Sequence, residues 1–178
     1  MTKPTPPTPS AFPETIIAAW NTSHRVMTFL VESLPADLWR ATIPGTSRRT
    51  FRTLAAHIHN ARCTWVRTLG EPHGIIPPPR VDRQNVQRKQ LVAAMNRSGD
   101  AVARLLRFGC DHEGRIPPTR SYVWRNLPLD VGHVLAYLVA HEGHHRGQMI
   151  LAARQLGHPL SSDITGGIWQ WTKRAKET

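Results

Sequence analysis

The sequence predicts an all-α protein, a four-helix bundle with a long loop before its last long helix. Apolar residues recur near every third or fourth position in four separate segments, which is the spacing of amphipathic helices. Strand-type alternation is nearly absent, and prolines or glycines punctuate the segment boundaries. With 178 residues, 40% of them hydrophobic, the chain is long enough for one domain with a sizeable core.

The N-terminal residues differ in composition from the rest of the chain. Residues 1–12 contain prolines and threonines and few apolar side chains, so we expect a flexible tail there. The first helix is predicted over residues 13–34, because Pro35 disfavours its continuation. The second helix is predicted over residues 47–69, and Gly70 would end it.

A third helix is predicted to begin at Asp82, a good N-cap, and to end at Phe108, with Gly109 as its stop. The run 98–100, Ser-Gly-Asp, is expected to weaken or kink this helix. Residues 110–127 contain two adjacent prolines and a short β-prone patch, which indicates a long crossover loop.

The fourth helix is predicted over residues 128–157, with Pro128 in its first turn and Gly157 as its stop. The bundle would then occupy residues 13–160. The remaining segment, 161–178, contains two tryptophans and is expected to pack on the bundle, with Trp169 sealing it.

Histidines gather in the middle of this fourth helix, in the run His141-Glu142-Gly143-His144-His145. At ~100° per residue, the first and last of these imidazoles project within ~40° of each other, so both can reach one metal ion. Ordinary exposed or hydrogen-bonded helix histidines are the alternative. The i, i+4 pairing and further histidines on another helix favour metal binding.

A third ligand is expected from the second helix, which contains His57 and His59. These two side chains point ~200° apart on a helix, so they cannot both face one metal ion. The apolar stripe that includes Leu54 and Ile58 favours His57 and leaves His59 near solvent. A small error in the assumed helix rotation would favour His59 instead.

Three neutral imidazoles suit a divalent metal ion, zinc or nickel above all, and the sequence does not decide which ion binds. An ion held in this way can activate a water molecule or a thiol. The site predicted from the residues therefore consists of His141, His145 and a histidine of the second helix.

The chain resembles the DinB/YfiT-like superfamily in three segments. These are Thr53-Leu54-Ala55-Ala56-His57-Ile58-His59-Asn60-Ala61-Arg62, then His141-Glu142-Gly143-His144-His145-Arg146-Gly147-Gln148, and finally Gly167-Ile168-Trp169-Gln170-Trp171. The resemblance implies a four-helix bundle, often a homodimer, with a divalent metal ion held by His57, His141 and His145. Some relatives are metal-dependent transferases that add a low-molecular-weight thiol to an electrophile, and many have no assigned reaction.

The working hypothesis is therefore a metal-dependent thiol S-transferase or hydrolase that acts on a small electrophilic substrate. The alternative is a metal-binding or stress-related interaction protein without turnover. The sequence offers no catalytic residue beyond the metal site.

Three further residues are candidates for the surroundings of the site: Glu142, Gln148 and His133. Glu142 completes the His-Glu-x-x-His signature of zinc proteases, but the longer form of that signature fails at Gln148, so we expect Glu142 to pair with Arg146 one turn later. Gln148 lies three residues after His145 and could fix the tautomer of its ring. His133 could line the mouth of a pocket.

Composition limits the partners and the compartment. The 23 Lys and Arg against 12 Asp and Glu give a net charge of +11, which attracts anionic molecules, but the basic residues are scattered and match no nucleic-acid-binding motif. Two cysteines do not form a disulfide framework. No apolar run is long enough to span a membrane and no signal peptide is recognisable, so we expect a cytoplasmic protein.

Overall fold

The computed structural model describes residues 11–177, and within this range the chain is helical without β-strands. The predicted all-α fold is confirmed. The long helices are α1 (Ala11–Ser33), α2 (Phe51–Leu69), α3 (Arg88–Asp111) and α4 (Val131–Gln155). Shorter elements are the 3-10 turns η1 (Leu38–Arg40) and η2 (Glu71–His73) and the helices α5 (Ser162–Gly167) and α6 (Trp171–Arg174). The tail expected at residues 1–12 falls mostly outside the described residues, and its last two residues belong to α1.

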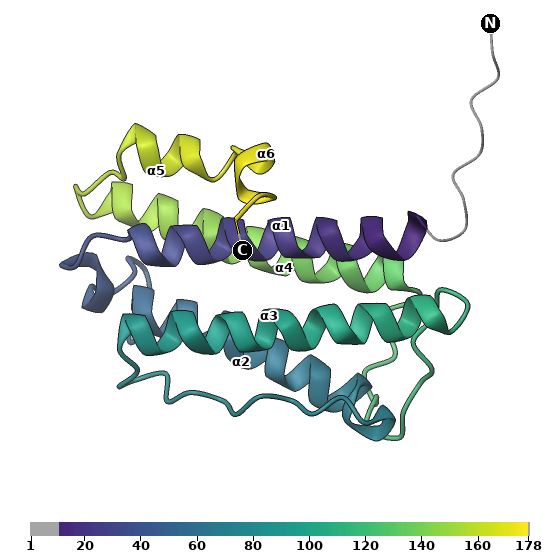
Figure 1. Cartoon of the computed structure of the whole chain (residues 1–178). Coiled ribbons are helices and arrows are strands. Elements are labelled where there is room, and N and C mark those ends of the chain that lie inside the picture. Colours follow the sequence, from purple (N-terminus) through teal and green to yellow (C-terminus); the bar gives the residue numbers. More distant parts are fainter. Residues whose placement is uncertain (1–10, 178) are drawn as a thin grey trace, which may run out of the picture.

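The four long helices form a bundle, in which α3 and α4 also contact each other across the core (Figure 1). Helix α1 contacts α3 and α4, and helix α2 contacts the same two helices from the opposite side. The short helices α5 and α6 lie against α1. This arrangement places α2 beside α4, the two helices that carry the histidines singled out in the sequence.

Two helices begin later than the sequence predicted, because side-chain caps fix their first turns. Helix α2 begins after Thr50, where the backbone N–H of Thr53 donates to Thr50 Oγ1 (3.2 Å) and that of Thr50 donates to Thr53 Oγ1 (2.8 Å). Helix α4 begins after Asp130, which accepts a hydrogen bond from the backbone N–H of His133 (3.0 Å). Pro128 therefore precedes α4.

Helix α3 also differs from its predicted bounds. It begins at Arg88, and Asp82 caps an isolated turn upstream instead. Gly109 does not stop the helix, which continues to Asp111. A Cβ atom at Gly109 would lie 2.5 Å from Val131 Cγ1 and 2.8 Å from Ile116 Cγ1, so this glycine permits a close contact with the loop and with α4.

The C-terminal segment contacts α1 through residues other than the predicted tryptophan. Trp169 is 72% exposed, so it does not seal the bundle. Ile168 is buried in its place, and a Cβ atom at Gly167 would lie 2.6 Å from the ring of Phe29. The guanidinium of Arg174 lies 4.0 Å from the centre of the same ring. Small and cationic residues therefore make this contact.

Buried polar side chains connect the four long helices inside the bundle. Arg62 donates from Nε to Glu142 Oε1 (2.6 Å) and from Nη2 to Glu142 Oε2 (2.8 Å), and both side chains are 1% exposed. Arg62 Nη1 also donates to the carbonyl oxygen of Met95 (3.1 Å) and lies 3.0 Å from His24 Nδ1. One guanidinium thus joins all four helices. The expected pairing of Glu142 with Arg146 is wrong.

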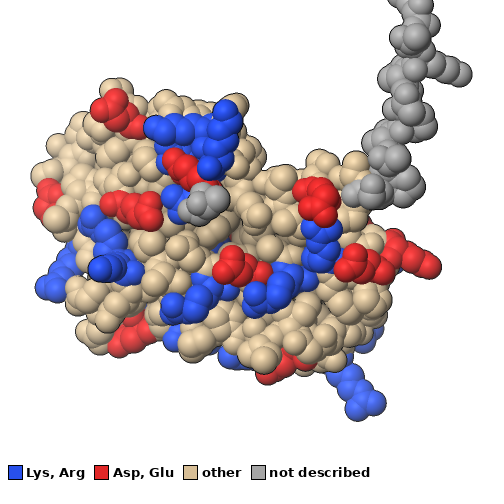
Figure 2. Space-filling model, in the orientation of Figure 1, with Lys and Arg blue, Asp and Glu red and all other residues tan. Residues whose placement is uncertain are grey.

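Charged side chains are mixed on the face of the molecule that Figure 2 shows. Basic and acidic groups alternate over it without forming a continuous stripe of one sign. This face therefore lacks the basic track that follows a nucleic-acid backbone. Among the described residues, no helix has the length and apolar character needed to cross a lipid bilayer.

Candidate metal centre

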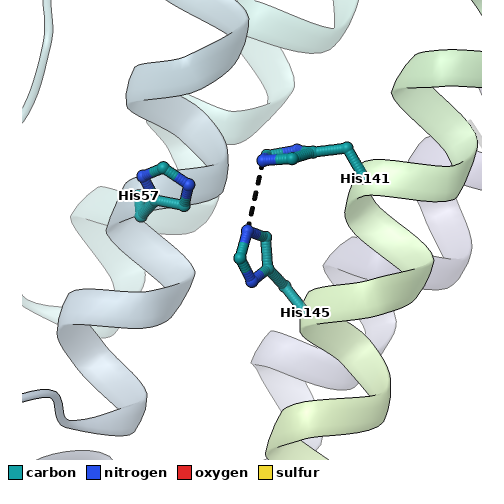
Figure 3. Close-up of side chains that lie close together, drawn as sticks. All are labelled: His57, His141 and His145. Atoms are coloured by element: carbon teal, nitrogen blue, oxygen red, sulfur yellow. Dashed lines mark hydrogen bonds between the residues drawn. The ribbon is translucent and has the colours of Figure 1, made fainter.

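Three imidazoles meet between α2 and α4: His57 from α2, and His141 and His145 from α4 (Figure 3). Their candidate ligand atoms all lie within 4.8 Å of one another, and the Nε2 atoms of His141 and His145 are 3.1 Å apart. Nitrogens around a tetrahedral zinc ion at ~2.0–2.1 Å are separated by about 3.3 Å. The three-histidine cluster is therefore compatible with a divalent metal ion.

The other histidine of α2 has a different role. His59 is fully buried, which corrects the expectation that it meets solvent. Its Nε2 lies 3.1 Å from the carbonyl oxygen of Pro79 and its Nδ1 lies 3.0 Å from Ser98 Oγ on α3. The opposite orientation of His57 and His59 is as the helix geometry predicts. Helix α3 also runs without a break through residues 98–100, where Ser98 makes this buried contact.

Gln148 lies where it can fix the tautomer of His145. Its Oε1 is 2.9 Å from His145 Nδ1, and its Nε2 is 3.0 Å from Nε2 of the exposed His144. An amide oxygen can only accept a hydrogen bond, so His145 Nδ1 carries the proton. The lone pair of His145 then resides on Nε2, which faces His141.

The electrostatic surroundings keep the three rings neutral. The pKa of His57 is lowered to about 4, mainly by burial and then by the charges of His145, His141, Arg83 and Arg49, in that order. Burial is also the main cause of the lowered pKa values of His141 and His145. Near neutral pH each ring therefore has a nitrogen lone pair available for a cation.

An aromatic group that the sequence analysis missed lies next to the cluster. The ring of Tyr137 stacks on that of His141, with centroids 6.2 Å apart, and meets those of Trp65 (5.2 Å) and Trp124 (5.9 Å). Trp65 and Trp124 also line a small cavity of about 210 Å³. Tyr137 precedes His141 by one helical turn, a spacing that could have indicated its position.

Two candidates from the sequence do not face the cluster. His133 is exposed at the start of α4, where its ring contacts Asp130. The carboxylate of Glu142 points into the bundle towards Arg62, so it cannot be the solvent-accessible general base of a zinc protease. The structure thus removes both residues from the immediate surroundings of the three imidazoles.

The fold and the cluster together are those of a helical-bundle protein with three histidines that could hold a metal ion. The chain belongs to the DinB family, whose pattern matches residues 8–173, nearly the whole sequence. The resemblance seen in the sequence is thereby confirmed. A search of curated proteins gives no significant match.

Proposed function

We propose that this protein is a divalent-metal-dependent enzyme that transfers a low-molecular-weight thiol to a small electrophilic substrate. The observation that carries the proposal is the convergence of three neutral imidazoles at a half-buried position between two helices. Three protein ligands leave a coordination position for a reactant, which is typical of catalytic rather than structural sites.

The residues fit a divalent ion such as zinc or nickel. His57, His141 and His145 would hold it, and Gln148 keeps the Nε2 lone pair of His145 available. The bound ion would act as a Lewis acid. It would lower the pKa of a thiol bound to it, so that this thiol is deprotonated near neutral pH. The buried flank of the rings and the stacked Tyr137 exclude water from one side of the cluster.

The reacting thiol would have to come from another molecule. Cys63 is buried, burial raises the pKa of its thiol, and its Sγ lies 3.4 Å from His59 Nε2, not at the cluster. Cys110 lies in the last turn of α3, and burial likewise raises its pKa. Neither cysteine belongs to the three-histidine cluster, so a small external thiol is the natural nucleophile.

Elemental analysis of the purified protein tests the metal site. We expect about one zinc or nickel ion per chain, and loss of that metal in His57→Ala, His141→Ala and His145→Ala. His133→Ala is the control, since His133 is exposed at the start of the same helix and contacts Asp130, so its loss should leave the metal content unchanged. A wild-type protein without stoichiometric metal, or ligand variants that keep it, would rule the site out.

Turnover is tested separately with an electrophile such as monochlorobimane and with glutathione, mycothiol and bacillithiol as thiols. Thiol-dependent product formation that disappears on metal removal is the expected result. Product formation without a thiol would identify a hydrolase. A metal-loaded protein that converts none of a broad set of electrophiles would favour the non-catalytic, metal-binding alternative.

Gln148 offers a finer test of how the site is organised. We expect Gln148→Ala to weaken metal affinity about 10–100-fold, because the hydrogen bond that orients the His145 ring is lost. Gln148→Glu keeps an acceptor at this position and should retain most of the affinity. Competition with a chelator measures the affinities. Equal affinity in Gln148→Ala and the wild type would contradict this role.

A further inference from the structure

A basic pocket of about 840 Å³ lies over the first half of α2, between the loop before this helix and the segment that follows η2. We call it the arginine pocket. Its lining includes Arg48, Arg49, Arg80 and Arg83, together with Thr53 and Asn60 of α2. Its volume is in the range of small-molecule sites, and four of its lining residues are arginines.

The arginine pocket is next to the three-histidine cluster. Thr53 and Asn60 line it from α2, and both project to the same side of His57, ~40° and ~60° from it around the helix axis. Arg49 and Arg83 line the pocket from the two chain segments that lie over this part of α2. The pocket and the cluster therefore share one stretch of α2, along which a small molecule held by these arginines would extend to His57.

The backbone segments that carry these arginines are tied down. The backbone N–H of Val81 donates to Asn60 Oδ1 (2.9 Å), and Asn60 Nδ2 donates to the carbonyl oxygen of Val81 (3.1 Å). His59 holds the neighbouring Pro79 in the same way. In the loop before α2, the backbone N–H of Ile43 donates to the carbonyl oxygen of Arg49 (2.7 Å). The backbone of the pocket is therefore held in place, while the four arginine side chains are exposed to solvent.

The four lining arginines form no ion pair with a carboxylate in the part of the chain that the structure describes. The only lining acid is Asp82, whose oxygens accept from the backbone N–H of Gln84 (2.8 Å) and from Asn85 Nδ2 (2.7 Å). Free guanidiniums match the paired oxygens of a carboxylate or phosphate.

We propose that the arginine pocket binds the anionic group, a carboxylate or a phosphate, of the small molecule that reacts at the three-histidine cluster. The reaction itself rests on the proposed function, but anion binding does not require the metal. In this arrangement, Arg49 and Arg83 hold the charged end of the molecule while its reactive atom extends along α2 to His57.

Calorimetric titration of metal-free protein at constant ionic strength tests the inference, with succinate and inorganic phosphate as probes. We expect saturable binding of at least one probe, weakened about tenfold or more in the double variant Arg49→Gln/Arg83→Gln. The control is Arg104→Gln/Arg154→Gln, which removes the same charge from exposed positions on α3 and α4. It should bind like the wild type, and the tighter probe identifies the preferred anion.

Absence of saturable binding to the wild type would overturn the inference, as would equal weakening in the two double variants. Its failure is distinguishable from that of the proposed function. The protein could take up no metal and still bind anions in a way that depends on Arg49 and Arg83. This result would support the arginine pocket and contradict the proposed enzyme activity. In an active enzyme, loss of these two arginines should raise KM for an anionic substrate and leave kcat nearly unchanged.

Discussion

Replacement of Glu142 by leucine is expected to destabilise the fold by about 3–5 kcal/mol, because Arg62 would keep its charge in the core without a partner. Both side chains are 1% exposed and share two short hydrogen bonds, so neither solvent nor a neighbouring acid can take over from the lost carboxylate. Urea unfolding of the metal-free protein, followed by circular dichroism, measures the loss.

The double variant Arg62→Met/Glu142→Leu is the control for this effect. It removes both charges at once and should recover most of the lost stability, since apolar side chains of similar size can fill the same space. If the double variant were as unstable as Glu142→Leu, lost packing would explain the effect better than an unpaired charge. If Glu142→Leu were as stable as the wild type, the buried pair would have no energetic role.

The same residue separates the two interpretations of the His-Glu-x-x-His signature. In a zinc protease, the glutamate would face the metal and its reactive water. Here the Glu142 carboxylate points ~100° away from His141 around α4 and binds Arg62 inside the bundle. In this signature, therefore, the two histidines are candidate metal ligands, whereas the glutamate forms a buried ion pair that joins α4 to α2.

Sequence periodicity was sufficient for the parts of the site that depend on one helix. His141 and His145 lie one turn apart on α4, and this local geometry fixes their convergence without knowledge of the rest of the fold. The apolar stripe of α2 favoured His57 over His59 but also placed His59 near solvent, whereas the structure buries His59 fully. The periodicity of four segments likewise predicted the bundle itself.

Contacts between distant segments could not be predicted in this way. The partner of Glu142 is 80 residues away in sequence, so the nearest basic residue on the same helix face, Arg146, was the natural but incorrect choice. The arginine pocket likewise depends on Asn60, which brings the segment around Val81 against α2. Neither contact joins residues at a regular sequence spacing, so the periodicity of the sequence cannot predict it.

The roles of Trp169 and Gly109 could not be predicted either, because they depend on how distant segments pack together. A tryptophan near the end of a chain usually covers a core, yet the contact with Phe29 is made by Gly167, where a larger residue would not fit. Gly109 looked like a helix stop because glycine commonly ends helices. Its actual role is to admit Val131 and Ile116, which only the packed structure reveals.

Acidification is expected to destabilise the metal-free protein through His24, whose side chain is buried between α1 and α3. Its pKa is lowered to about 3, mainly by burial and then by the charges of Arg62 and Arg25, while a hydrogen bond with Asn96 opposes the shift. The unfolded chain binds this proton near the ordinary pKa of 6.5, whereas the folded chain does not until the pH approaches 3. The unfolded state therefore gains protons first as pH falls, and the free energy of unfolding decreases.

The other groups around His24 do not reverse this sign. Asp100 and Glu177 line the same cavity of about 420 Å³ together with Arg25, and Glu177 is engaged by Arg25 and Arg174. Arg62 Nη1 lies 3.0 Å from His24 Nδ1, so a proton on that nitrogen would face a guanidinium. A charged His24 would thus lose its hydrogen bond and meet a like charge inside the bundle.

Between pH 6.5 and pH 4.5, His24 is expected to lower the free energy of unfolding by about 2 kcal/mol, because only the unfolded chain takes up a proton on this residue. His24→Gln should flatten the dependence of the unfolding free energy on pH by this amount, while His112→Gln, at an exposed position after α3, should leave the slope unchanged. Urea unfolding of metal-free protein at several pH values measures the slopes. Parallel curves for the wild type and His24→Gln would mean that other groups, and not this buried imidazole, make the fold sensitive to acid.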